Sequence, residues 1–309
     1  MQPDKLFDRS RLKHTKSLFW LAVVSVFGAL VLVPLWILDT TELLGVPVWE
    51  KPIKFFISSA IFSFTYSWLS SFITKGARWV KLAGLFIAVS LTVELVLISA
   101  MASLGTTSHF NVSSPTAIVV WSLMATFISI VLFSTIVISV MIMFQKQLEF
   151  NLKLALALGS INTAVGMGLA YLMTWPTANQ LANYQGIAGA HAVGVPDGGP
   201  GLPFLGWSTV AGDLRVGHFF GLHSIQVAAI LLAVSLLLPI AFRIPLIVVG
   251  NITWLGFVGL VTWQSLRAEP FASPSEQTII SFVALAVFAT ILFAALSLSQ
   301  SRVRTKKMA

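Results

Sequence analysis

The sequence predicts an all-α, polytopic integral membrane protein with about eight transmembrane helices. Hydrophobic residues make up 57% of the 309-residue chain, charged residues only 10%, and the mean hydropathy is +0.90. Soluble domains usually contain about 25% charged residues, so this composition indicates a chain surrounded by lipid. Apolar segments long enough to cross a bilayer core, about 20 residues each, occupy residues 18–38, 53–73, 79–101, 116–144, 152–174, 218–240, 245–266 and 277–299. Residues 1–309 therefore form one transmembrane domain, with the lipid bilayer as its first partner.

The distribution of basic residues predicts the orientation of these helices. With eight spans both chain ends lie on one side, and fifteen of the 19 Lys and Arg residues then fall on that side. The four exceptions are Lys51, Lys54, Arg215 and Arg267. Because basic residues concentrate on the cytoplasmic side, we expect a protein of the cytoplasmic (inner) membrane with basic cytoplasmic tails at residues 1–17 and 300–309. The net charge of +8 thus orients the chain and does not indicate a nucleic-acid partner.

The links between spans are unequal on the two sides. The first span follows a basic stretch as a signal peptide would, but no small-residue cleavage pattern accompanies it, so we expect a retained helix. The cytoplasmic links are short and basic, whereas the longest external link, residues 175–217, is rich in Gly and Pro. Loops of this length are usually functional or disordered. Its aromatic residues, Trp175, Tyr184, Phe204 and Trp207, favour either a packed lid or an anchor at the membrane interface.

Two spans begin with similar residues, which suggests an internal repeat. Residues 51–56 and 215–220 both read as a basic residue, two further residues, Lys or His, and then two Phe. An acid, Glu50 or Asp213, stands just before each. Both spans run from outside to inside, so we predict two parallel four-helix halves, an arrangement used by some transporters. Coincidence in a chain with 23 Phe is the alternative.

Candidate functional residues concentrate on the external side, above all in residues 213–226. Ionisable residues at a membrane boundary are costly without partners, so they mark candidate sites. If one helix includes Arg215, its geometry places that residue, His218, His223 and Gln226 within about 140° of one another. Glu94 lies inside a span and needs a partner. The predicted ligand-binding residues are Glu50, Lys51, Lys54, Glu94, His109, Asn111, Asp213, Arg215, His218, His223 and Gln226.

The first interpretation of these residues is a polar pocket that opens externally in a transporter or receptor. It binds a small anionic or protonatable ligand. Arg215 and Lys54 hold the anionic group, with bidentate geometry from the guanidinium. His218 or His223 handles protons or a metal.

Three alternatives stay open. His109, His218 and His223 are candidate ligands of a metal or haem in a membrane oxidoreductase, although a five-residue spacing suits one ion less well than i, i+4. A membrane-embedded hydrolase or transferase is the second alternative, with Ser108 or Ser224 as nucleophile. The third is a purely structural polar network. Because the chain has no Cys, iron–sulfur clusters and disulfides are excluded; whether the protein is an enzyme is left open.

Three stretches, residues 49–55, 108–111 and 213–223, resemble segments of an uncharacterised family of bacterial polytopic membrane proteins. The resemblance extends over most of the chain. It implies a multi-span membrane fold and no established activity, so no residue receives a role from it.

Overall fold

The fold is seen in a computed structural model that describes residue 11 and residues 13–308, with the backbone alone described for residues 302–308. Most of the predicted tail at residues 1–17 and the end of the predicted tail at residues 300–309 lie outside the described residues. The helices are α3 (Lys16–Leu38), α4 (Glu50–Ser70), α5 (Ala77–Ser103), α6 (Pro115–Met143), α7 (Phe150–Gly168), α8 (Tyr171–Thr174), α9 (Ala178–Ala182), α10 (Arg215–Leu222), α11 (Ser224–Leu236), α12 (Ile240–Leu266) and α13 (Glu276–Met308).

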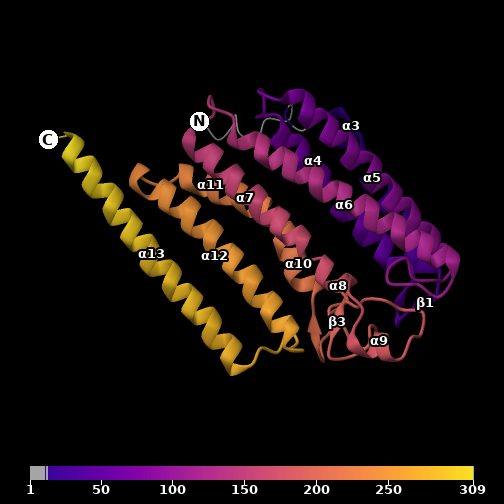
Figure 1. Ribbon diagram of the computed structural model, residues 1–309. Coiled ribbons are helices and arrows are strands. Elements are labelled where there is room, and N and C mark those ends of the chain that lie inside the picture. Colours follow the sequence, from indigo (N-terminus) through magenta and orange to yellow (C-terminus); the bar gives the residue numbers. More distant parts are fainter. Residues whose placement is uncertain (1–10, 12, 309) are drawn as a thin grey trace.

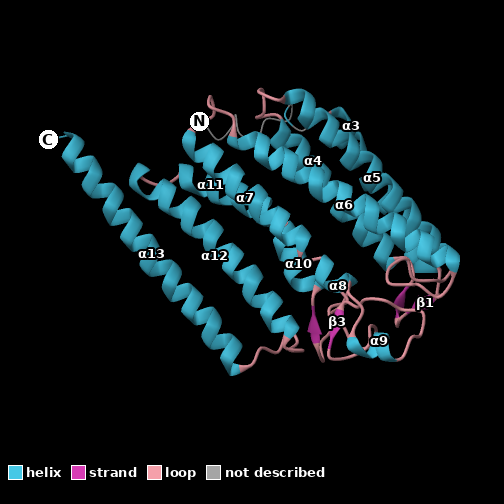
Figure 2. Ribbon diagram, viewed as in Figure 1, coloured by secondary structure: helices cyan, strands magenta, loops and turns pink. Residues whose placement is uncertain are grey.

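Strands are a minor component of the described chain (Figure 2). Four two-residue strands form two antiparallel pairs: β1 (Glu42–Leu43) with β2 (Val46–Pro47), and β3 (Ala192–Val193) with β4 (Gly212–Asp213). Both pairs lie in connecting segments and shape the loops. The predicted all-α class is therefore confirmed.

Every predicted apolar segment contains a helix, but the helices are not equally apolar. Among the described residues, six are long and apolar enough to cross a membrane, and the bent pair α10–α11 makes a seventh. The 21-residue helix α4 is not one of them; it carries five serines and three charged residues. The chain is thus a multi-pass membrane protein by these criteria, and the count of eight spans stays a prediction.

The long helices lie side by side, with α3 at one edge of the bundle and α13 at the other (Figure 1). The β pairs, α8, α9 and the longest loops gather at one end, which we call the loop-rich end: residues 39–49, 104–114, 169–214 and 267–275. Helix α3 begins, and α13 ends, at the opposite end. Any site at the loop-rich end is therefore built from helix termini and loops together.

Contacts between helices follow the same order in the first and second parts of the chain. Helices α3, α4 and α5 contact one another, and α6 packs against α5. In the second part α7, the α10–α11 pair and α12 contact one another, and α13 packs against α12. Helix α6 also packs against α7 and so joins the two parts.

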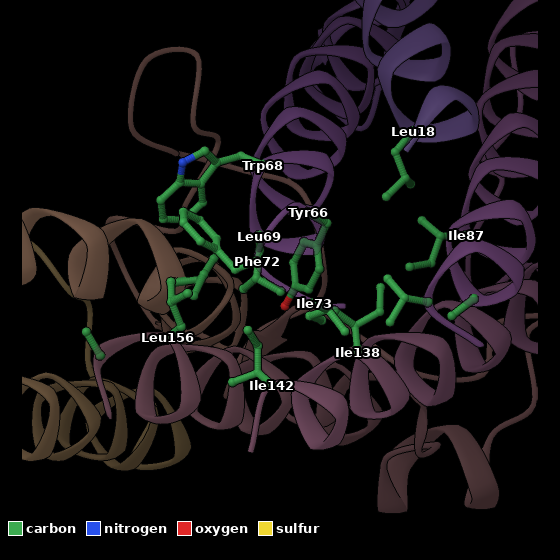
Figure 3. Close-up of a cluster of buried hydrophobic side chains, with 14 of the residues drawn as sticks. Leu18, Tyr66, Trp68, Leu69, Phe72, Ile73, Ile87, Ile138, Ile142 and Leu156 are labelled. Atoms are coloured by element: carbon green, nitrogen blue, oxygen red, sulfur yellow. The ribbon is translucent and has the colours of Figure 1, made fainter. Parts of the chain in front are cut away.

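A buried apolar cluster holds these helices together, mostly in the half of the bundle away from the loop-rich end; Figure 3 shows its side chains. Tyr66 and Leu69 come from α4, Ile87 from α5, Ile138 from α6 and Leu156 from α7. In a bilayer such packing is driven by van der Waals contact, because lipid is as apolar as the side chains. The cluster fixes α4 in the interior, with its first turn at the loop-rich end.

Glycine allows α7 and α10 to approach closely. A Cβ on Gly166 would collide with the backbone of Gly221, and a Cβ on Gly221 would collide with Gly166. Small residues at such a crossing let two membrane helices pack backbone to backbone. Gly168, two residues further on, has open space around its Cβ position.

We predict that Gly166→Ala lowers the free energy of unfolding in detergent by about 1–3 kcal/mol, because the backbone of α10 must move to admit the methyl group. Gly168→Ala is the matched control and should change stability little. Equal stability of the two variants would contradict the close α7–α10 contact.

Candidate functional site

The eleven predicted site residues do not converge on one point. They divide into an ion-pair cluster (Glu50, Lys54, Asp213, Arg215), a lysine site (Lys51, Glu94, His109) and a group around the break between α10 and α11 (His218, His223, Gln226), with Asn111 apart from all three.

The ion-pair cluster contains a bidentate arginine–aspartate pair. Arg215 Nη2 lies 2.6 Å from Asp213 Oδ2 and Nε lies 2.9 Å from Oδ1. Asp213 is only 1% exposed and also accepts a hydrogen bond from the backbone N–H of Ser208. Charged groups buried this deeply persist only when paired and hydrogen-bonded. The pair therefore satisfies itself within one segment.

A second pair, Lys54 Nζ with Glu50 Oε1 at 2.8 Å, lies in the first turn of α4. Lys54 also donates to the carbonyl oxygen of Phe204 at 2.9 Å, and Arg215 Nη2 donates to that of Gly206. Phe204 has φ of 60° and Gly206 has φ of 69°, so this short turn of the long loop is tightly bent. Cations from two helices thus hold one loop turn at the loop-rich end.

This arrangement differs from the sequence interpretation of Lys54 and Arg215. Both cations were expected to hold an anionic ligand, but Lys54 gives its hydrogen bonds to Glu50 and to the loop carbonyls of Phe204 and Leu205. Arg215 likewise pairs with Asp213 and Gly206. Each acid pairs with the cation of its own segment, and the loop turn links the two pairs.

A further pair in the long loop, His191 with Asp197, is absent from the predicted site. His191 Nδ1 lies 2.9 Å from Asp197 Oδ2, and the backbone N–H groups of His191 and Ala192 donate to the same carboxylate. Burial alone would raise the pKa of Asp197, but the hydrogen bond and charge of His191 and the two amides together lower it to about 2. The ionised carboxylate therefore fixes the fold of this loop.

The lysine site is built from the first turn of α4 and the loop after α5. Lys51 Nζ lies 3.2 Å from His109 Nδ1, and Ser108 Oγ lies 3.0 Å from the same nitrogen. The His109 ring packs beside Phe55 and Trp121, with centroids 5.8 and 5.4 Å away. Burial, followed by the charges of Lys51 and His191, lowers the pKa of His109 well below its usual value. His109 is thus neutral at neutral pH and accepts from Lys51.

Lys51 differs from the other cations at the loop-rich end. Lys54, Arg215 and Arg267 each have a carboxylate partner. Among the described residues Lys51 has no such ion pair; its hydrogen-bond partner is a neutral histidine. The half-buried ammonium group is therefore available to a further negative charge.

Two acids act on Lys51 through their charge: Asp197 in the long loop, which has the larger effect, and Glu94 from inside the bundle. Glu94 lies in α5 and is 3% exposed, and its Oε1 has no hydrogen-bond partner among the described residues. No ion pair joins it to Lys51 within the described structure. A buried carboxylate oxygen without a partner is rare in proteins and calls for an explanation.

The third group does not share one helix face, because the helix breaks at His223. Helices α10 and α11 meet there at 43°. His218 donates from Nδ1 to the carbonyl of Gly166 at 2.8 Å, His223 packs against Phe219, and Gln226 donates to Thr65 Oγ1 at 3.0 Å. These polar groups thus have separate partners on α7, α10 and α4.

The residues predicted for a metal or haem site and for a hydrolase are not clustered in the described structure. In the part of the chain that the structure describes, no group of three or more His, Cys, Asp or Glu side chains is placed to hold a metal ion. Ser224 is 1% exposed and is hydrogen-bonded to Gly221 and Trp254, while Asn111 makes a local turn with Ser113. The metal, haem and hydrolase interpretations therefore gain no support from this geometry.

A groove of about 640 Å³ lies elsewhere, between α11, α12 and α13. Its lining is apolar, with Leu231, Phe257, Phe282 and Phe293 among the residues, and it contains none of the predicted site residues.

No protein-family model, curated protein sequence or solved structure matches this chain. Its function must therefore be argued from the geometry of its own residues.

We expect Asp197→Ala to destabilise the protein by about 2 kcal/mol at neutral pH, since the pKa falls from 3.8 to about 2 on folding. A lowered pKa means that the stabilisation is complete above the unfolded value of 3.8 and disappears as the pH falls through the folded value. The difference in unfolding free energy between wild type and variant should therefore shrink between pH 3.8 and about 2.

Glu42→Ala removes an exposed acid at the same end and serves as the control for Asp197→Ala. It should leave stability nearly unchanged at neutral pH. A deficit in Asp197→Ala that stays constant across this acid range would contradict the assigned role of the carboxylate.

Proposed function

We propose that this protein binds a small anionic ligand at the lysine site, as a transporter or receptor of a bacterial-type cytoplasmic membrane. The observation that carries the proposal is the Lys51 ammonium group. It is half-buried and lacks a carboxylate partner among the described residues, whereas every other cation at this end has one. The charges of Asp197 and Glu94 act on Lys51 without direct contact. A half-buried charge without a directly bonded counter-charge is unfavourable, and an anionic ligand supplies that contact.

The ion-pair cluster has a supporting role in this proposal. Its two cations hold the turn at residues 204–206 to α4 and α10. The charge of Arg215 also acts on His191, as does that of Lys51, so the loop-rich end forms one electrostatic unit. The loop then covers the lysine site and limits its access to water. In this proposal the long loop is the predicted lid, and the ion pairs are the predicted structural network that holds it in place.

The orientation and the two-half architecture belong to the same proposal. The excess of basic residues at the end opposite the loops favours cytoplasmic termini and an external loop-rich end. The matching contact order of α3–α6 and of α7, α10–α11, α12 and α13 supports two parallel halves. In this arrangement Lys51 and Arg215 occupy equivalent positions in the two halves. Arg215 pairs with Asp213, whereas Lys51 has no carboxylate partner among the described residues.

The test is stabilisation by anions at constant ionic strength. Acetate, benzoate, chloride and phosphate are titrated against the purified protein in detergent, and the unfolding temperature is recorded. At least one of these anions should raise the unfolding temperature of the wild type. Lys51→Gln should abolish that increase, while Lys51→Arg keeps the charge and should retain part of it.

Arg267→Gln is the matched control, because it removes a cation at the same end that already has an acidic partner. It should leave the anion effect unchanged. Stabilisation of Lys51→Gln by the same anions to the same extent as the wild type would overturn the proposal, and so would the absence of any effect in the wild type.

A further inference from the structure

We infer that Glu94 binds a proton together with the anion, so that the ligand of the lysine site is a small monocarboxylic acid taken up as anion and proton. The inference rests on the proposed function. Its starting point is the Glu94 side chain, which is 3% exposed and has an unpartnered Oε1.

The surroundings of Glu94 contain one available counter-charge. Helix α5 packs against α3, α4 and α6. Helix α6 has no titratable residue, and the charged residue of α3, Lys16, lies at the opposite end of the bundle. Helix α4 contributes Lys51, since its Glu50 and Lys54 pair with each other and its Tyr66 lies in the apolar cluster. On the loop after α5, His109 is neutral and bonded to Lys51.

Lys51 and Glu94 therefore form a pair of opposite charges without a direct bond. An anion that binds Lys51 takes away the counter-charge of Glu94 and brings a second negative charge close to it. Two negative charges in a poorly solvated site repel each other, and protonation of one of them relieves the repulsion. The balanced step is the addition of one anion at the Lys51 ammonium group and one proton from solution at the Glu94 carboxylate.

The same surroundings restrict the ligand. One ammonium group without a carboxylate partner matches one negative charge. The walls of the site are aromatic: the Phe55 and Trp121 rings both pack against the His109 ring, and Lys51 Nζ is 5.9 Å from the Phe55 ring centre. A single carboxylate on a small apolar body fits this combination better than a multiply charged phosphate. Such an acid also carries its own proton when it is neutral.

The experiment measures proton uptake when acetate or benzoate binds to the purified protein in weakly buffered detergent, at several pH values from neutral to alkaline. Burial lowers the pKa of Lys51 to about 7, so this side chain also takes up a proton when an anion binds above neutral pH. In the alkaline range the wild type should therefore take up about one proton more per bound anion than Glu94→Gln, and its apparent affinity should fall more steeply with pH. Glu94→Gln should bind the same anions with the proton uptake of Lys51 alone.

The matched control is Glu42→Gln, which removes an exposed acid at the same end and should keep the proton uptake. Infrared difference spectra give an independent readout: the band of a protonated carboxylic acid should grow on anion binding and be missing in Glu94→Gln. Anion binding through Lys51 with equal proton uptake in the wild type and Glu94→Gln overturns this inference alone. Absence of anion binding overturns the proposed function as well, and stronger binding of phosphate than of benzoate overturns the ligand class.

Discussion

The structure depends on one constraint: a charge within a membrane bundle must have a partner. Taking an ion out of water is expensive, and only an opposite charge with good hydrogen bonds offsets that cost. The pairs Asp213–Arg215 and Glu50–Lys54 obey this rule at distances of 2.6 and 2.8 Å. Lys51 and Glu94 do not have such contacts, and they are the groups around which a function can be argued.

The paired and unpaired charges depend on each other through the long loop. Lys54 and Arg215 hold the turn at residues 204–206, and Asp197 organises the neighbouring segment through His191. His191 in turn packs against Phe110, next to His109. The order of the loop is thus supported by ion pairs, and the charge of Asp197 in this loop acts on Lys51.

The helices were predictable from the sequence because about 20 apolar residues in succession have few alternatives to a helix in lipid. The location of the polar residues was also predictable, since Lys51, Asp213 and His218 stand beside helix starts. Their pairing was not. Besides Glu50 and Asp213, the partners of Lys54 and Arg215 are loop carbonyls at residues 204–206, and the sequence of that stretch does not predict its turn.

The break at His223 was missed for a related reason. The apolar pattern runs through residues 218–240 without a proline until Pro239, so one straight helix was expected. In the structure Trp254 donates to the carbonyl of Phe220 and to Ser224 Oγ, one on each side of the break. A partner on α12 thus stabilises the bend, and sequence periodicity does not reveal such a partner. His191 and Asp197 are absent from the predicted site because they lie in a Gly-rich loop without periodicity.

The most direct test of the lysine site is a double-mutant cycle on the unfolding free energy in detergent, with Lys51→Met, Glu94→Gln and the combined variant, at a series of pH values on both sides of neutrality. If the two charges face each other in the bundle as described, the double variant should be more stable than the sum of the single changes predicts, by about 0.5–3 kcal/mol. Strict additivity would show that Lys51 and Glu94 do not interact and would contradict the lysine site.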